Sequence, residues 1–216
     1  MAKAPDKKKS DGENWNLESI AKAIKTMSKT LSIIGDTEIT ELCTVRKIKT
    51  GIPTIDYLGG GGITEGAITI FAGNPSACKT TLAMQTIAAI ITEWKASDIH
   101  KIVLYFDTEH SWDPLYAKEL GIDQNYVVIK HTCVIEEAFA EADQLISMGF
   151  VGMLVIDSLD NMIARKVEDN AYSATMGGTA GALAQHLPKL HSKIIEYKVT
   201  TIVIKQARVN TILPPW

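Results

Sequence analysis

Five short apolar runs divide the chain from residue 50 onward. Each has the length of a strand and consists mostly of β-branched or aromatic residues, as strands buried on both faces require. These runs are 67–72, 102–106, 126–129, 153–156 and 201–204. Helical stretches lie between them, at 80–91, 114–120, 135–148 and 181–195. The alternation predicts an α/β fold in which helices flank a mostly parallel sheet.

The first 49 residues have a different character. Residues 1–14 combine three consecutive lysines with Gly, Ser and Asp, which predicts a flexible tail. Residues 15–49 form an N-terminal helical arm in this interpretation, because their apolar residues follow each other at spacings of three and four, which gives one narrow helical stripe. That stripe packs either on its own domain or on a neighbouring subunit. The stripe consists of Leu17, Ile20, Ile24, Met27 and Leu31.

Composition limits the classes of partner. The net charge is −3 over 216 residues, so any contact with nucleic acid has to come from a local surface. The cysteines Cys43, Cys78 and Cys133 are odd in number and far apart, which fits a reducing compartment. No apolar run reaches the roughly 18 residues of a membrane span, and the start has no signal-peptide core. We therefore expect a soluble, cytoplasmic protein with no membrane partner.

The segment between the first predicted strand and the first predicted helix has the pattern of a P-loop. In this context backbone N–H groups form an anion-binding nest, and the helix N-terminus adds partial positive charge. Lys79 would bridge the β- and γ-phosphates, and the Thr80 hydroxyl would bind Mg²⁺. The expected cofactors are ATP and Mg²⁺. The segment consists of Gly73, Asn74, Pro75, Ser76, Ala77, Cys78, Lys79, Thr80 and Thr81.

Cys78 departs from the P-loop pattern G-x-x-x-x-G-K-[ST], because it stands where the second glycine is usual. If that position needs a positive φ, a β-carbon there costs about 1–2 kcal/mol. The alternative interpretation is an ordinary strand-to-helix turn that happens to contain Lys-Thr.

Three polar residues follow later strands, at the edge where a parallel sheet binds its ligands. Asp157 closes the fourth strand and would hold Mg²⁺ through water; the alternative is a helix cap. Glu109 follows the second strand and could activate the attacking water as a general base, although Asp107 and Glu109 could instead cap the next turn. Gln206 follows the fifth strand, where its amide could bond the γ-phosphate.

One longer segment makes a family resemblance specific. Residues 106–121 read FDTEHSWDPLYAKELG and are similar over their whole length to the stretch after the second core strand of RecA recombinases. Residues 50–56, the glycine run before Ile63, and residues 155–159 and 204–208 fall in the family's order and approximate spacing. The resemblance covers about residues 50–208. The imperfect P-loop looks more like that of recombinases from tailed bacteriophages.

The resemblance assigns roles by position. It implies that Glu109 is the catalytic glutamate and that Lys79 and Gln206 act with it, Gln206 as the γ-phosphate sensor. Asp113 and Tyr116 match residues that contact the adenine, Tyr116 by stacking. Lys205 replaces the asparagine that is usual before the sensor glutamine.

The resemblance also implies DNA contacts and a filament. Residues 165–178 correspond to the first DNA-binding loop, with Arg165, Lys166 and Tyr172 as candidates, and Arg208 lies where the second loop begins. On composition alone, residues 165–178 fit a plain solvated loop equally well. The arm within 15–49 matches the helix that packs on the adjacent protomer, which predicts a homo-oligomeric filament.

The chain ends at Trp216, where the family's second DNA-binding loop begins, so residues 50–216 would form an incomplete RecA-like core. Strand 67–72 would then be an exposed edge, prone to pairing with other chains.

The leading hypothesis is an ATP-dependent recombinase that binds single-stranded and double-stranded DNA in a bacterial or phage-infected cytoplasm. The alternative is a non-catalytic or accessory subunit that binds nucleotide or a recombinase filament. A RecA-fold helicase or clock-type ATPase would explain the P-loop but not residues 109–121.

Overall fold

A computed structural model describes residues 22, 26, 45–165 and 178–207 of the chain. Internal contacts divide the chain into two units, Met1–Val45 and Arg46–Trp216. In the first unit, Lys22 and Thr26 are helical, and the Thr26 hydroxyl donates to the Lys22 carbonyl at 2.8 Å. The predicted tail at 1–14 and the rest of the predicted helical stripe lie outside the described residues.

The second unit contains a sheet of five strands, in the order β3-β7-β6-β4-β5. All of its neighbouring strands run parallel. The prediction of an α/β fold with a mostly parallel, helix-flanked sheet is confirmed. The strands are β3 (Ile68–Gly73), β4 (Ile102–Asp107), β5 (Val127–Lys130), β6 (Val151–Asp157) and β7 (Thr200–Gln206).

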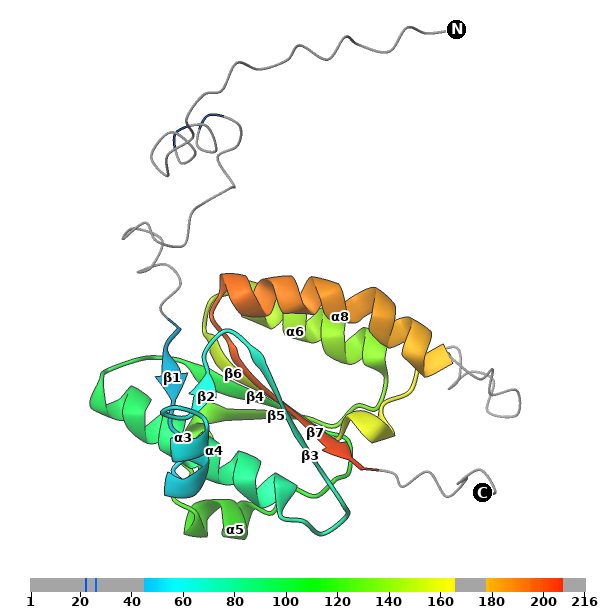
Figure 1. Cartoon of the computed structure of the whole chain (residues 1–216). Helices are drawn as coiled ribbons and strands as arrows, with labels where there is room; N and C mark the ends of the chain where they lie inside the picture. Colours follow the sequence, from blue (N-terminus) through cyan, green and yellow to red (C-terminus); the bar gives the residue numbers. More distant parts are fainter. Residues whose placement is uncertain (1–21, 23–25, 27–44, 166–177, 208–216) are drawn as a thin grey trace, which may run out of the picture. The chain divides into compact units, whose positions relative to one another are not determined.

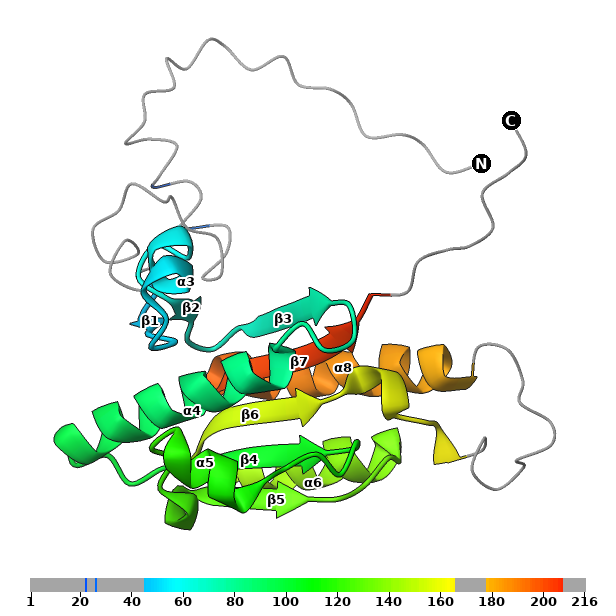
Figure 2. The same ribbon diagram turned by 90° about the horizontal axis from the view of Figure 1, so that it is seen from below.

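Helices cover both faces of this sheet (Figures 1 and 2). Strand β4 explains why both faces need a cover: Val103 and Tyr105 join the apolar cluster of one face, whereas Leu104 and Phe106 join the cluster of the other. Successive side chains of a strand alternate between faces, so an unbroken apolar run requires two layers of helices. Helices α4 (Lys79–Ala96) and α5 (Pro114–Glu119) cover the first face, and α6 (Ile135–Ser147) and α8 (Gly178–Glu196) cover the second.

Several short elements were not predicted. Strand β1 (Lys47–Ile48) pairs antiparallel with β2 (Ile63–Thr64), and α3 (Pro53–Leu58) lies between them. Gly62 has φ 125°, and a β-carbon there would collide with the Ile48 carbonyl oxygen, so the turn before β2 requires glycine. The short helices η1 (Gln124–Tyr126) and η2 (Leu159–Asn161) complete the fold. Elements of two to six residues are too short to establish a periodic pattern.

Helix ends also differ from the predicted ones. Helix α4 extends five residues beyond the predicted end at 91, and α8 begins three residues before 181. The predicted strands match the observed ones within a few residues, because composition marks a strand's interior better than its ends.

The strand order has two consequences for the site. Strand β3 pairs only with β7 within the described chain, and its Ile70 side chain is 58% exposed, which is the edge position expected from the sequence. Because the strands are parallel, the carboxyl ends of β3, β4, β6 and β7 meet at one edge of the sheet. No helix in the described ranges is both long and apolar enough to cross a membrane.

Candidate nucleotide-binding site

A cavity of about 450 Å³ opens at the carboxyl edge of the sheet. It joins the P-loop segment to residues at the ends of β4, β6 and β7, which are separated by up to 97 positions in the sequence. Such a convergence of polar groups at the strand ends is typical of ligand sites in parallel sheets. The lining residues are Pro75, Ser76, Ala77, Cys78, Lys79, Thr80, Thr81, Glu109, Asp157, Ile204 and Gln206.

The loop between β3 and α4 has the backbone of an anion-binding nest. Ser76 and Cys78 have φ values of 60° and 57°, in the left-handed region, and such turns direct successive N–H groups to one side. No side chain caps the N-terminus of α4, so its first N–H groups are available to a ligand. Lys79 Nζ donates to the Asn74 carbonyl at 2.7 Å, which holds the ammonium beside the loop. The arrangement fits a phosphate group.

The left-handed conformation of Cys78 makes its β-carbon costly. We expect Cys78→Gly to raise the free energy of unfolding by about 1 kcal/mol, because glycine adopts positive φ without strain. For a chain of this size that change corresponds to about 2–4 °C in Tm, measurable by thermal unfolding. Ala77→Gly is the matched control: Ala77 has no positive φ, so glycine there should not stabilise. An equal gain in both variants would contradict the strain.

Asp157 lines the cavity and is 1% exposed. Its Oδ2 atom accepts hydrogen bonds from Thr80 Oγ1 at 2.7 Å and from Tyr105 Oη at 2.8 Å. Burial raises the pKa of Asp157, the two hydrogen bonds lower it, and the charges of Glu109 and Asp107 raise it again. Burial, together with the charge of Asp157, also raises the pKa of Tyr105, so the phenol keeps its proton and donates.

The donor set around Asp157 fits Mg²⁺. One carboxylate and one threonine hydroxyl stand beside the phosphate nest, and Mg²⁺ is commonly held by one or two carboxylates with phosphates and waters completing its shell. The described part of the chain contains no group of three His, Cys, Asp or Glu residues that could hold a metal. A metal at Thr80 and Asp157 would therefore depend on the nucleotide for its remaining ligands.

The raised pKa of Asp157 makes a prediction about stability. Between the ordinary aspartate pKa and the raised folded value, the folded protein binds more protons than the unfolded chain, so stability falls as pH rises through this window. Asp157→Asn should remove that fall and leave the Tm at pH 7 unchanged or higher, since the amide oxygen can still accept from Thr80 and Tyr105. Mg²⁺-dependent ATP affinity should fall about tenfold because a charged ligand is lost.

Asp123 provides a control of opposite sign for the Asp157 experiment. A hydrogen bond from Lys95 lowers the pKa of Asp123, so its contribution is present above the ordinary pKa and is lost as pH falls. Asp123→Asn should therefore lower stability at neutral pH, though only slightly because solvent screens this exposed pair, whereas Asp157→Asn should not lower it. Thermal unfolding between pH 4 and pH 8 distinguishes the two variants. A drop in Tm at pH 7 for Asp157→Asn would contradict the assigned sign.

Glu109 lines the same cavity as the P-loop segment and accepts hydrogen bonds from two donors. Its Oε1 atom accepts from Ser158 Oγ at 2.5 Å and from Gln206 Nε2 at 3.3 Å. The three residues lie at the ends of β4, β6 and β7, which the sheet brings together. Both described contacts use Oε1, so the other oxygen, Oε2, is the one that a general-base role would use; that role stays a prediction.

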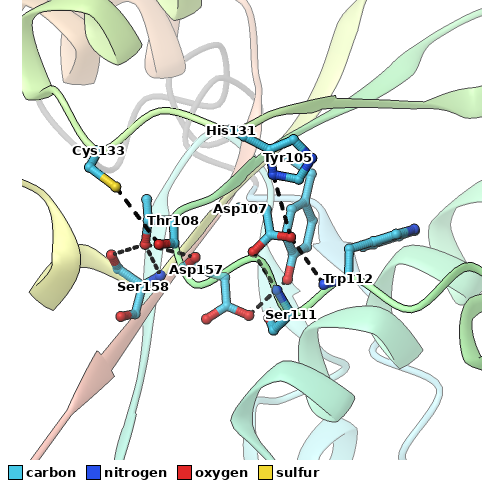
Figure 3. A network of polar contacts seen from close by, with 9 residues as sticks. All are labelled: Tyr105, Asp107, Thr108, Ser111, Trp112, His131, Cys133, Asp157 and Ser158. Carbon is cyan, nitrogen blue, oxygen red and sulfur yellow. Dashed lines mark hydrogen bonds and ion pairs between the residues drawn. The ribbon is translucent and has the colours of Figure 1, made fainter.

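A polar network holds this edge together (Figure 3). The Thr108 hydroxyl accepts from the Ser158 N–H at 2.8 Å and the Thr108 N–H donates to the Asp157 carbonyl at 2.8 Å, which joins the ends of β4 and β6. The buried Asp107 carboxylate accepts from the N–H groups of Ser111 and Trp112, both at 3.0 Å. Asp107 therefore caps the turn after β4, and Glu109 does not share that task.

The sequence alone missed three members of the site. Ser158 donates to the Glu109 carboxylate and Tyr105 donates to the Asp157 carboxylate. The Thr108 hydroxyl donates to the backbone carbonyl of Asp157. Ser158 had a signal, because it directly follows Asp157 at a strand end. Tyr105 had none, since an aromatic residue within a buried strand reads as core. Thr108 precedes Glu109 but is an ordinary turn residue in the sequence.

The two predicted adenine contacts lie outside the cavity lining. Asp113 caps α5, where its Oδ1 atom accepts from the N–H groups of Leu115 at 2.8 Å and Tyr116 at 3.2 Å. Tyr116 is 36% exposed on the same helix, so its ring is open to solvent. Their role in binding adenine stays a prediction.

Of the four predicted DNA contacts, the structure describes one. Arg165 Nη2 forms an ion pair with Glu137 Oε1 at 2.7 Å, and the backbone N–H of Arg165 donates to Glu136 Oε2 at 3.0 Å. The guanidinium is exposed but engaged, so a phosphate would have to compete for it. Lys166, Tyr172 and Arg208 lie outside the described residues, as does most of the predicted loop 165–178. A DNA contact by any of the four stays a prediction.

Comparison with known proteins agrees with this geometry. The family model of the RecA N-terminal domain matches residues 16–213. Protein RecA of Fusobacterium nucleatum is 33% identical over an alignment of 216 positions, gaps included, which covers 96% of this chain and 56% of that protein. Protein RecA of Agrobacterium fabrum is 35% identical over 77% of this chain and 45% of its own length, and that of Thermotoga petrophila is 30% identical over 88% and 53%. The chain spans about half the length of these relatives. Because the domain model matches residues 16–213 and a relative 33% identical covers 96% of the chain, the chain belongs to the RecA family.

Proposed function

We propose that this chain is the ATP-binding and ATP-hydrolysing core of a DNA recombinase. In this proposal it binds single-stranded DNA in the presence of ATP and Mg²⁺, pairs that strand with a homologous duplex, and hydrolyses ATP to release it. The observation that carries the proposal is the position of Glu109, whose carboxylate contacts both Ser158 and Gln206 over the P-loop. Membership of the RecA family supports it.

The residues divide the phosphoryl-transfer chemistry between them. The nest and the N-terminus of α4 hold the phosphates, and Lys79 places a positive charge beside them. Mg²⁺, bound with Thr80 and Asp157, would neutralise negative charge on the phosphates. Glu109 would orient a water molecule and accept its proton. Positioning and charge stabilisation are the main means by which proteins accelerate this reaction.

Gln206 offers a route from nucleotide to DNA. Its side-chain amide contacts Glu109 at 3.3 Å, and its backbone ends β7, one residue before the described chain stops at Ala207. An amide that exchanges Glu109 for a γ-phosphate oxygen would shift the start of the segment in which Arg208 is predicted to contact DNA. The proposal includes a filament of identical subunits, with the 15–49 arm on a neighbouring protomer, in the cytoplasm of a bacterium or phage-infected host.

The second candidate is an accessory role without strand exchange. The left-handed Cys78 favours it, because a β-carbon at this position destabilises the loop conformation that would bind the phosphates. In this role the chain would bind nucleotide or join the filament of a complete recombinase.

ATP hydrolysis with and without single-stranded DNA separates the two candidates. We expect the recombinase to hydrolyse ATP about tenfold faster when single-stranded DNA is present, because binding of the strand completes the catalytic arrangement. The measurement is phosphate release by the full chain with Mg²⁺, at fixed ionic strength, because DNA binding weakens with salt. Nucleotide binding without turnover supports the accessory role, and absence of nucleotide binding at millimolar ATP rejects both.

A further inference from the structure

Strand β7 continues past the end of its pairing with β6. The last paired residues are Ile156 and Val203, whereas β7 extends to Gln206. On its other side β7 stays paired with β3 up to Gly73, and the N–H of Ala207 donates to the Gly73 carbonyl at 3.0 Å. The tip of β7 therefore has a strand neighbour on one side only, and a backbone N–H directed to the other side needs a different acceptor.

Asp160, in η2, is that acceptor. Its Oδ2 atom accepts from the Gln206 N–H at 2.6 Å, and its Oδ1 atom lies 3.8 Å from Lys205 Nζ. The Asp160 side chain is 11% exposed and the Lys205 side chain 52%. The charged hydrogen bond to the backbone is thus shielded and strong, whereas the ion pair is largely in solvent and weak.

This contact completes a closed chain of contacts that includes the Glu109 carboxylate. Ser158 and the Gln206 side chain both donate to Glu109 Oε1, and Asp160, two residues after Ser158, accepts from the Gln206 backbone. Of the contacts that hold the tip of β7, the one from Glu109 would be lost if the glutamine amide turned to a phosphate oxygen. The Asp160 contact can persist through that exchange, because it uses the backbone and not the side chain.

We propose that Asp160 is a positioning residue that fixes the Gln206 backbone, so that binding of a γ-phosphate is transmitted to the segments leaving η2 and β7. The segment after η2 leads to Arg165, and the one after β7 leads to Ala207, at the two predicted DNA-binding regions. Lys205, where the family usually has asparagine, assists by its charge and is not the main contact. The DNA part of this inference rests on the proposed function.

The test compares ATP with ADP. The affinity of the full chain for a fluorescent single-stranded oligonucleotide is measured by anisotropy, once with ATP and once with ADP. The ratio of the two affinities measures how strongly the bound nucleotide affects DNA binding. Asp160→Ala should reduce the ratio about tenfold, the effect of losing a hydrogen bond to a charged group, while the Kd for ATP stays within about twofold. Asn161→Ala, an exposed neighbour in η2, is the matched control and should leave the ratio unchanged.

Two further substitutions at Asp160 and one at Lys205 identify the interaction. Asp160→Asn keeps an oxygen that can accept from Gln206 and should restore most of the ratio. Asp160→Glu keeps the charge but moves the acceptor by one methylene and should behave like Asp160→Ala, which also covers the case in which the alanine variant does not fold. Lys205→Met should change the ratio by no more than about twofold, because an exposed ion pair contributes little. A loss in Asp160→Asn equal to that in Asp160→Ala would overturn the hydrogen-bond role.

Hydrogen exchange separates this inference from the proposed function. If the unaltered chain binds no DNA in either nucleotide, the proposed function fails, but the Gln206 amide can still be followed. It should exchange about tenfold faster in Asp160→Ala than in the unaltered chain, and addition of ATP should protect residues 200–206 in the unaltered chain only. Equal ATP-induced protection in both proteins would overturn the role of Asp160, whatever the outcome with DNA.

Discussion

Lys79→Ala is expected to weaken ATP binding by about 100-fold or more, which is the effect of losing one or two charge-assisted hydrogen bonds to phosphate. The ammonium lies beside the P-loop, held by the Asn74 carbonyl, and is the one cation among the residues that line the cavity. Its removal leaves the phosphates to the backbone N–H groups and the helix N-terminus alone. Titration with a fluorescent ATP analogue in the presence of Mg²⁺ measures the change.

The matched control for Lys79→Ala is Lys49→Ala, which removes an exposed lysine that does not line the nucleotide cavity. We expect ATP affinity in this control to stay within about twofold, since distant exposed charges are screened by salt. Both variants should unfold at the temperature of the unaltered chain, because neither side chain is buried. Equal loss of affinity in the two variants would mean that charge in general, and not Lys79, attracts the nucleotide.

Glu109→Gln is expected to slow ATP hydrolysis by about 10²–10⁴-fold while the Kd for ATP changes little. The amide cannot accept the proton of water at neutral pH, but its oxygen can still accept from Ser158, so the geometry of the edge is kept. Single-turnover phosphate release measures the chemical step, and the fluorescent analogue measures binding in the same sample. A loss confined to turnover would assign Glu109 to catalysis.

Glu119→Gln is the control for the glutamate experiment, because Glu119 is exposed at the end of α5 and does not line the cavity. Its rate should equal that of the unaltered chain. Glu109→Asp adds a test of position: the carboxylate is kept but shortened by one methylene, so hydrolysis should be slow again although a base is present. Full activity in Glu109→Gln would exclude this residue as the general base and leave the chemistry to the phosphate-bound water and the metal.

The elements themselves were largely readable from the sequence. The run at 102–106 is almost the whole of β4, and the stretch at 135–148 matches α6, because burial on two faces and a helical apolar stripe leave repeating patterns in the chain. Residues 75–81 of the predicted P-loop line the cavity, and they could be named as a set because they are consecutive between a strand and a helix. Strand β1 and helix α3 were not predicted, because elements of two and six residues are too short to show a periodic pattern.

The sequence determined which chemistry this protein can contain: a phosphate loop with Lys79 and Thr80, and carboxylates at Asp157 and Glu109. The tertiary structure decided which groups act together. Glu109 meets Ser158 and Gln206 across separations of 49 and 97 residues only because the strand order places β4, β6 and β7 side by side. The same is true of the contact between Asp160 and the Gln206 backbone, which joins η2 to the end of β7. Local patterns record burial and turn preference, but contacts between strand ends depend on how the sheet is ordered, which no local pattern encodes.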